Sequence, residues 1–439
     1  MTRAPALLVP LIVVAVTILA LLWLFSLPAE PISRGFFLTI PNGWAYAVLG
    51  FIIAASGIGL AAYLYGRVTR PGKAVSYALT AATHIFIWVV VAAMLYPVIY
   101  LLATSFNRAD NIASVPPREG GILVRSGVIP NPGQFSTIQY ERVLGETNIL
   151  PFQWLLIGVF VLALLVLIGA LVGKRLGGNP YRLERYQSYA GWTLFLTIFG
   201  LVISITPDQF YTINAAGERV PASSERKILL YIRNTLLVSG TAGLFAVLIA
   251  TTAGYAFARM RFEGRYYTLL TFIFVQMFPG FMALVAIFYL MSYLGLLNTF
   301  TGLILAYSGG AIAFSSWIFK GYLESISPSL EEAAMVDGTT RWGAFWYIIL
   351  PVSIPMLLFI FLLQFIGTYS EFILASTLLI GENNWTVGIG LRNFTAGRFD
   401  TQWGALAASA VLGSLPILII FYAFQGALTG QHTAGGVKG

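Results

Sequence analysis

Long apolar runs, each about the length of a membrane span, alternate with short polar breaks along this chain. About 20 consecutive apolar residues are needed to cross a ~30 Å hydrocarbon core. Because lipid cannot satisfy free backbone N–H and C=O groups, such runs must be helices. Alternating segments of about ten residues, the pattern of a membrane β-barrel, are absent. We therefore predict an all-α polytopic membrane protein with about ten transmembrane helices, at residues 6–27, 43–65, 83–104, 152–172, 189–206, 235–257, 268–291, 302–319, 346–369 and 405–425.

Composition supports a membrane protein and excludes several kinds of site. Of the 439 residues, 58% are apolar and 10% charged, whereas a soluble domain has about 25% charged residues. The net charge of +8 lies mostly in loops, and no basic run interleaved with aromatic residues predicts nucleic-acid binding. The chain has no cysteine and only two histidines, His84 and His432, so we predict no metal site. His84 is interpreted as an interfacial residue at the entrance of a span.

The distribution of Lys and Arg predicts the orientation. Loops 66–82, 173–188 and 258–267 are rich in basic residues, whereas loops 28–42 and 292–301 are poor in them. Short cytoplasmic loops carry the excess of Lys and Arg. We therefore expect both termini in the cytoplasm.

The first apolar run, 6–27, is longer than the 7–15-residue core of a signal peptide. A poor cleavage site follows it at residues 26–29. We interpret this run as a retained anchor.

A polar segment between two apolar runs has the signals of a short helix over Pro328–Asp337. Ser327 can cap it, with the proline at the first helical position. Ser329 and Glu332 also fit a capping box. Gly338 can adopt the left-handed conformation that ends a helix, and a second helix is expected from near Thr340 into the next span.

The face of this helix indicates what it contacts. Leu330, Ala333 and Ala334 form a small apolar surface, and the neighbouring side chains are acidic. Helices that lie on a membrane favour Lys, Arg and bulky apolar residues. An acidic helix with small residues therefore favours docking of a separate protein.

At this segment the chain resembles a known family. Glu332-Ala333-Ala334, then Gly338, then Ile348-Ile349-Leu350-Pro351 match the EAA loop of permease subunits of binding-protein-dependent ABC importers. The resemblance implies a six-helix type I importer core whose EAA loop, here 320–345, docks in a cleft of a cytoplasmic ATPase. The residues it assigns to ATPase coupling are Glu332, Ala333, Ala334, Asp337, Gly338, Arg341, Ile348, Leu350 and Pro351.

Further segments resemble the sugar-importer branch. These are residues 255–262, 276–279 and 320–322, and the chain end resembles that of maltose permeases. The similarity covers residues 84–107 and 233–439, about half of the chain. It implies import of maltose or a maltodextrin through the bacterial inner membrane, with most sugar contacts on a second permease subunit.

The resemblance also implies partners and contact segments. The other partners are an ATPase homodimer that holds ATP and Mg²⁺, with no cofactor on this chain, and an extracytoplasmic sugar-binding protein. The outer loop 381–399 is expected to reach that binding protein through Asn383, Asn384, Trp385, Gly388 and Gly390. The cytoplasmic tail is expected to insert between the ATPase subunits through Thr433, Ala434, Gly435, Gly436, Val437, Lys438 and Gly439.

The chain departs from the six-span pattern by four additional predicted spans. Insertion of spans in pairs preserves the orientation of everything that follows. The expected organisation is an N-terminal extension with two spans (1–82), the first core helix and outer loop (83–151), an inserted span pair (152–206), the permease core (233–428) and a C-terminal tail (429–439).

Other mechanisms are disfavoured by what the predicted spans contain. Residues 169–175 fail the Walker pattern in spacing, and Arg175 replaces Ser/Thr, so we predict that this chain is not an enzyme. Gly169 and Gly173 are better explained as a packing pair. The predicted spans contain no Asp, Glu, Lys or Arg, which disfavours an ion-coupled secondary transporter.

Some alternatives remain open from the sequence. Gln276 and Gln364 could face a sugar pathway or form bonds between helices. The substrate could be another sugar, such as trehalose or glycerol phosphate. A non-transporting membrane scaffold is the remaining alternative.

Overall fold

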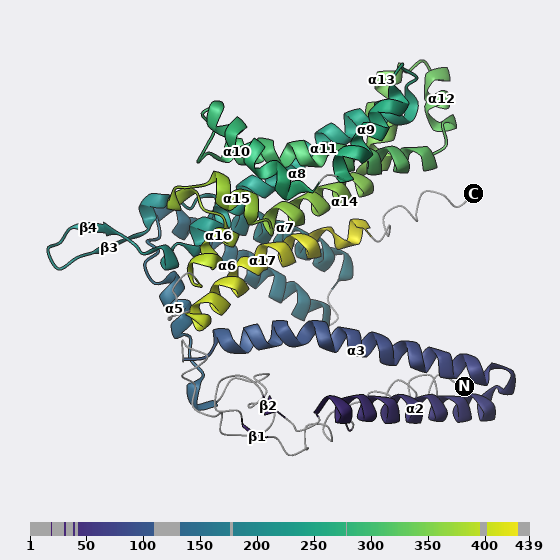
Figure 1. Ribbon diagram of the computed structural model, residues 1–439, viewed down its shortest axis with the longest axis horizontal. Coiled ribbons are helices and arrows are strands. Elements are labelled where there is room, and N and C mark those ends of the chain that lie inside the picture. Colours follow the sequence, from purple (N-terminus) through teal and green to yellow (C-terminus); the bar gives the residue numbers. More distant parts are fainter. Residues whose placement is uncertain are drawn as a thin grey trace. The chain divides into compact units, whose positions relative to one another are not determined.

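The computed structural model describes residues 43–108, 132–175, 179–277, 279–395 and 402–428, with Leu19 and two short strands before them (Figure 1). Eight helices in this part are long and apolar enough to cross a membrane, and a bent helix pair makes nine if it is counted as one span. The eight are α2 (Gly43–Thr69), α3 (Ala74–Ser105), α6 (Pro151–Arg175), α7 (Pro180–Ile203), α8 (Ile228–Arg259), α11 (Phe300–Ser325), α14 (Leu350–Tyr369) and α17 (Trp403–Leu428).

These helices confirm an all-α fold and most of the predicted spans. The predicted span 6–27 lies outside the described residues, apart from the helical Leu19. Several helices run past their apolar cores: α7 begins at Pro180, so much of the predicted loop 173–188 is helical. The longer α8 also contains Arg233 and Arg259 near its two ends. Ionisable groups are therefore present at helix ends, although the predicted apolar cores lack them.

The predicted span 268–291 is a bent pair of helices in the structure. Helix α9 (Arg265–Met277) and the segment formed by η6 (Gly280–Ala283) and α10 (Leu284–Tyr293) meet at an angle of 91°. Pro279 precedes η6 with extended backbone angles (φ −60°, ψ 116°). Proline lacks the N–H that would continue the ladder, and its ring clashes with the preceding turn. The apolar character of both halves concealed this break.

Helices α8, α11 and α14 pack together in the larger of two compact units, which comprises residues 143–396 and 412–439. Ala242, Ala246 and Ala250 are completely buried along one row of α8, and Gly254 continues the row. A Cβ atom on Gly254 would lie 2.8 Å from the ring of Phe319 in α11. Small residues at this spacing allow two membrane helices to approach closely, so α8 and α11 form a closely packed pair.

The other unit, residues 1–142 and 397–411, contains the packed helices α2 and α3. A Cβ on Gly66 of α2 would come within 2.8 Å of the Cα of Ala74, at the start of α3. Further along the two helices, α2 and α3 share a small cluster of buried apolar side chains: Ile58, Ala62, Ala81 and Ile85. At the other end of α3, Ser105 Oγ hydrogen-bonds Tyr140 Oη at 2.9 Å, and Gln139 Nε2 donates to the Asn107 carbonyl at 3.1 Å.

Short elements occupy the segments between the spans, and apart from α12 and α13 the sequence did not predict them. Antiparallel pairs join β1 (Glu30–Pro31) to β2 (Leu38–Thr39) and β3 (Tyr211–Ile213) to β4 (Arg219–Pro221). The remaining elements are α5 (Ile138–Leu144), α12 (Ser329–Val336), α13 (Arg341–Ala344), α15 (Ile373–Leu378), α16 (Val387–Asn393), the π-helical η7 (Phe345–Ile349), and the 3₁₀ turns η1 (Pro71–Lys73), η3 (Pro132–Gln134), η4 (Pro207–Gln209), η5 (Ser224–Arg226) and η8 (Glu382–Asn384).

Candidate functional site

The short helix α12 follows α11 and precedes α13 in the chain, and Figure 1 shows it beside α13. It spans Ser329–Val336, within one residue of the predicted bounds. Ser327 Oγ accepts from the Ser329 N–H at 3.3 Å and bonds the Ser329 hydroxyl at 2.7 Å. Ser327 was predicted as the cap with Pro328 at the first helical position; in the structure Pro328 holds the cap position, and Ser327 contacts the first helical residue from one position earlier. The Ser329–Glu332 capping box is wrong, because Pro328 occupies the cap position with no side-chain cap bond.

Gly338 ends α12 in the predicted way. Its φ is +88°, a conformation that costs non-glycine residues roughly 1–2 kcal/mol. The Gly338 N–H donates to the Met335 carbonyl at 3.1 Å, and the Thr339 N–H donates to the Ala334 carbonyl at 3.0 Å. This pair of bonds is the Schellman motif, which satisfies carbonyls at a helix end. The motif turns the chain sharply from α12 into the next helix.

The connection to α14 begins at Thr340, whose Oγ1 accepts from the Gly343 N–H at 3.1 Å. Helix α13, the π-helical η7 and α14 then follow without an interruption. Pro351 and Pro355 lie in the first turns of α14, and each removes one N–H from the ladder. The wider π-helical turn of η7 and the hydrogen bonds missing at the two prolines mark a place where the helix can bend. The segment predicted to carry motion into the span is therefore continuous helix from Arg341 onward, and its hydrogen-bond ladder is weakened where α14 begins.

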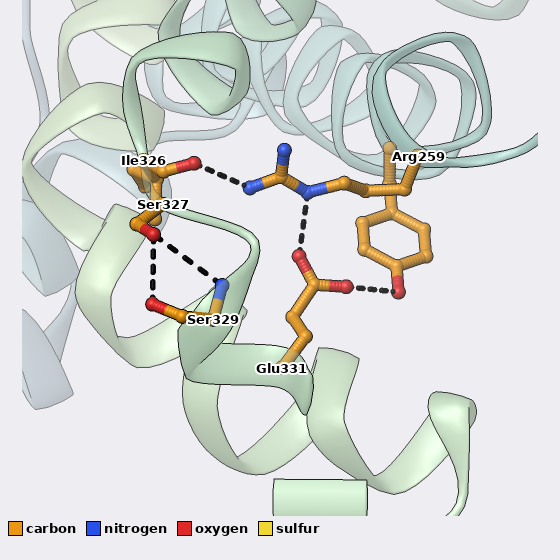
Figure 2. Close-up of polar contacts among 6 residues, drawn as sticks. Arg259, Ile326, Ser327, Ser329 and Glu331 are labelled. Atoms are coloured by element: carbon orange, nitrogen blue, oxygen red, sulfur yellow. Dashed lines mark hydrogen bonds and ion pairs between the residues drawn. The ribbon is translucent and has the colours of Figure 1, made fainter. Parts of the chain in front are cut away.

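One face of α12 packs on the chain itself through a buried ion pair (Figure 2). Arg259 Nε at the end of α8 lies 2.6 Å from Glu331 Oε1, and Tyr255 Oη donates to Glu331 Oε2 at 2.9 Å. Arg259 Nη2 also donates to the Ile326 carbonyl at 2.8 Å. The side chains of Arg259 and Glu331 are only 13% and 10% exposed. The ion pair joins α12 to the ends of α8 and α11.

This arrangement corrects the predicted docking face. Ala334, expected on that face with Leu330 and Ala333, is buried on the same side as Glu331. Leu330 and Ala333 are exposed, and Val336 is 87% exposed on the same row. Glu331 and Ala334 lie three residues apart and form the buried side, while Leu330, Ala333 and Val336, also three apart, form the exposed row. Leu330 lies four residues before Ala334, at the border between the two sides, so the sequence could not tell which of them is buried.

The other predicted coupling residues separate into exposed and packed positions. Glu332, Asp337, Arg341 and Pro351 are exposed. Ile348 and Leu350 are half-buried, and Leu350 packs against the cluster around Phe345 and Ile349. Three exposed aromatic residues on the same segment were not anticipated by sequence reasoning: Trp342, Trp346 and Tyr347.

The five predicted binding-protein residues lie in a segment that is fixed to its own chain. Lys227 Nζ pairs with Glu382 Oε1 at 2.8 Å. Asn234 Nδ2 of α8 donates to the carbonyls of Asn383 and Trp385 at 2.8 and 3.0 Å. Asn384 Nδ2 donates to the Asn298 carbonyl at 2.7 Å, where the backbone has a positive φ of 57°. The later part of this loop, 396–401, lies outside the described residues.

Two glycines of this loop lie in close packing. A Cβ on Gly390 would overlap the ring of the buried Tyr231, and one on Gly388 would lie 3.3 Å from the Cβ of Phe372. The rings of Tyr231 and Trp385 also pack together, with their centroids 6.0 Å apart. Gly388 and Gly390 therefore pack this loop against α8 and the residues before α15.

We expect Gly390→Ala to lower the stability of the purified protein. The added methyl overlaps a fully buried ring, and overpacking of this kind costs about 1–3 kcal/mol. The melting temperature in detergent, followed by tryptophan fluorescence, should fall by several degrees. Gly367→Ala in α14 is the matched control, because a Cβ there meets nothing within 4 Å. Equal melting temperatures for Gly390→Ala and the unmodified protein would contradict the packing described.

The remaining predicted residues are widely placed. Gln276 is exposed on α9, one residue before that helix ends, and Gln364 is half-buried in α14. His84 is exposed on α3, where Nδ1 contacts the Thr80 carbonyl at 2.7 Å. A Cβ on Gly173 would approach Leu183 at 3.3 Å, whereas one on Gly169 meets nothing within 4 Å, so of the two glycines only Gly173 packs closely within this chain. The C-terminal tail lies outside the described residues.

Groups of three or more possible metal-ligating side chains are absent from the described part of the chain. The candidate site consists of the exposed row of α12, which is Leu330, Ala333 and Val336, and the Arg259–Glu331 ion pair on its buried side. Sequence reasoning missed Glu331, Arg259 and Tyr255 as a unit. The only available signal was a cation and a tyrosine at i, i+4 near the end of one span, together with two adjacent acids in a separate helix.

The sequence from 246 to 430 matches the family described as binding-protein-dependent transport system inner membrane component. The chain belongs to this family and is a multi-pass inner-membrane permease subunit. It is 43% identical over 236 residues to the maltose/maltodextrin transport system permease protein MalG of Vibrio vulnificus (strain YJ016), covering 52% of this chain and 78% of the relative.

Further similarities agree with this family. MalG of Escherichia coli (strain K12) is 43% identical over 218 residues, which cover 48% of this chain and 73% of the relative. The structure also resembles a chain from the crystal structure of a bacterial ABC transporter involved in the import of the acidic polysaccharide alginate. That match has a TM-score of 0.50 and 16% identity, and it covers 79% of this chain and 95% of the other. At this identity the structural match supports the fold alone.

Proposed function

We propose that this chain is the permease subunit of an ATP-driven importer of maltose or maltodextrin-type oligosaccharides. The observation that carries the proposal is the exposed row of α12, which is held on a buried ion pair and joined by a short ordered turn to the continuous helix that runs from Arg341 into α14. The similarity to maltose/maltodextrin permeases over more than two thirds of their length supports the substrate class. The assembly would include a second permease subunit, an ATPase homodimer and an extracytoplasmic sugar-binding protein.

In this assembly the chain itself performs no hydrolysis. ATP and Mg²⁺ would be held by the partner ATPase, which would dock on Leu330, Ala333 and Val336, with Glu332 and Asp337 beside them. Closure of the ATPase dimer would move α12. Such a signal shifts the permease only if the dock binds one state of the partner more tightly than the other.

Motion of α12 would pass through α13 and η7 into α14 and rock the core spans about a central cavity. This is the alternating-access scheme of membrane transporters. Pro351 and Pro355 place the weakened helical ladder at the point where the connection enters the span. The coupling residues would thus act as a lever, while the transported sugar is contacted mostly by the second permease.

The distribution of Lys and Arg supports an orientation with α12 and both termini in the cytoplasm. The opposite end of the core carries the loop formed by α15, η8 and α16. Its fixation to α8 suits a rigid platform for the binding protein, with Asn383 as its exposed side chain among the five predicted contacts. We assign the C-terminal tail, 433–439, to contact with the ATPase dimer.

Uptake by proteoliposomes tests this proposal. Vesicles containing the full complex and trapped ATP should accumulate labelled maltodextrin only when the binding protein is added outside. Trehalose and glycerol phosphate as competitors distinguish the alternative substrates. Uptake that persists without ATP and collapses with an ionophore would contradict the proposal and identify an ion-coupled transporter. Unimpaired uptake by a complex lacking this chain would identify a scaffold.

A further inference from the structure

Arg259, Glu331 and Tyr255 form a contact that connects α12 to a second core helix. Glu331 uses one carboxylate oxygen for Arg259 Nε at 2.6 Å and the other for Tyr255 Oη at 2.9 Å. Tyr255 and Arg259 are one turn apart in α8, so both donors project from the same face. Arg259 uses a further nitrogen for the Ile326 carbonyl at the end of α11. Figure 2 shows Arg259 between Ile326 and Glu331.

The chain connections of α12 do not join it to α8. Residues 326–328 precede the helix and residues 337–340 follow it, and both connections are non-helical. Removing one partner of a buried ion pair leaves the other charge without compensation, which is strongly unfavourable. The Arg259–Glu331 contact therefore fixes the position of α12 relative to the closely packed pair α8–α11.

A second group of charges near this end provides a comparison. Glu324 Oε2 pairs with Lys320 Nζ at 2.8 Å, and Glu324 Oε1 lies 3.6 Å from Arg265 Nη2. The Glu324 side chain is 46% exposed, and its partners lie on α11 and at the start of α9, not on α12. Exposed pairs of this kind contribute little to stability. Glu324 is thus a matched acidic residue without a contact to the docking helix.

We propose that Glu331 and Arg259 are positioning residues that transmit the movement of α12 to α8, in parallel with the covalent path through α13 into α14. This inference rests on the proposed function. Force from the ATPase then enters two core helices together: α14 by continuous backbone and α8 by the ion pair. Loss of the pair leaves ATP hydrolysis possible but separates it from movement of α8 and α11.

The test uses the complete complex in proteoliposomes, with sugar uptake and ATP hydrolysis measured in the same vesicles. We expect Glu331→Gln and Arg259→Gln to lower the sugar transported per ATP by about tenfold or more, within the range typical of coupling between sites. Tyr255→Phe should lower the ratio less, because it removes one hydrogen bond and no charge. The double variant Arg259→Glu with Glu331→Arg should recover part of the loss. Glu324→Gln should keep the ratio of the unmodified complex.

The outcomes separate this inference from the proposed function. If the unmodified complex shows no ATP-dependent uptake, the proposed function is wrong. If it transports and Glu331→Gln keeps a normal ratio, or Glu324→Gln loses as much, the positioning role is wrong. If the charge variants do not accumulate in the membrane, Tyr255→Phe decides: a lowered ratio supports the role, and an unchanged ratio overturns it.

Discussion

Gly338→Pro abolishes ATP-driven uptake while the protein still inserts into the membrane. Proline requires a φ near −65°, whereas Gly338 has +88°. The substitution also removes the N–H that donates to the Met335 carbonyl at 3.1 Å. It disfavours the helical conformation of the preceding Asp337 (φ −72°, ψ 7°) as well. The Schellman turn cannot form, so α12 loses its fixed direction relative to α13. We expect uptake below the detection limit of the proteoliposome assay.

Two other substitutions at Gly338 serve as controls for this result. A Cβ there meets nothing within 4 Å, so side-chain volume is not the obstacle. Asparagine tolerates the left-handed conformation and should retain most uptake. Alanine, which pays about 1–2 kcal/mol in that conformation, should be intermediate. Normal uptake by Gly338→Pro, or equal losses in all three variants, would contradict the account of this turn.

Glu332→Lys should also prevent coupled uptake, but by a different route. Glu332 is exposed in the first turn of α12. Acidic side chains are favoured there by the helix dipole by about 0.3–1 kcal/mol, so the reversal hardly affects folding. At an interface, by contrast, a reversed charge costs several kcal/mol, and each 1.4 kcal/mol is about tenfold in affinity. The ATPase should therefore no longer copurify with the permease after a detergent wash that the unmodified complex survives.

Glu263→Lys is the matched reversal for this experiment. Glu263 is exposed in the turn between α8 and α9, outside α12, and its variant should copurify normally. Glu332→Gln should give an intermediate loss, because it removes the charge without reversing it. Retention of the ATPase by Glu332→Lys would show that this row of α12 is not the dock.

Sequence reasoning succeeded where the signal is local. Gly338 ends α12 as predicted, because a left-handed turn needs a particular residue at that position. The apolar runs likewise predicted the long helices, since lipid leaves few alternatives. The bend at Pro279 was missed because both halves of the segment are equally apolar, and hydropathy alone does not register a change of direction.

Contacts between distant segments could not be predicted in the same way. Arg259 and Glu331 are far apart in sequence, and their pairing depends on the packing of α8 with α11 and on the rotation of α12. The rotation of α12 about its own axis decides which of two adjacent residues is buried, and here it buries Glu331 and exposes Glu332. The adjacent acids Glu331 and Glu332 look equivalent in the sequence, yet only Glu331 is buried. Ala334 was misplaced for the same reason.

The central claim is that a nucleotide-hydrolysing partner binds the exposed row of α12. The chain has no cysteine, so Val336→Cys introduces a single thiol at a position that is 87% exposed. In active complexes, a short bifunctional reagent should link this thiol to the ATPase subunit, and the yield should change when ATP is added. A thiol that stays fully reactive toward a membrane-impermeant maleimide in actively transporting complexes, with no link to the ATPase, would contradict the claim.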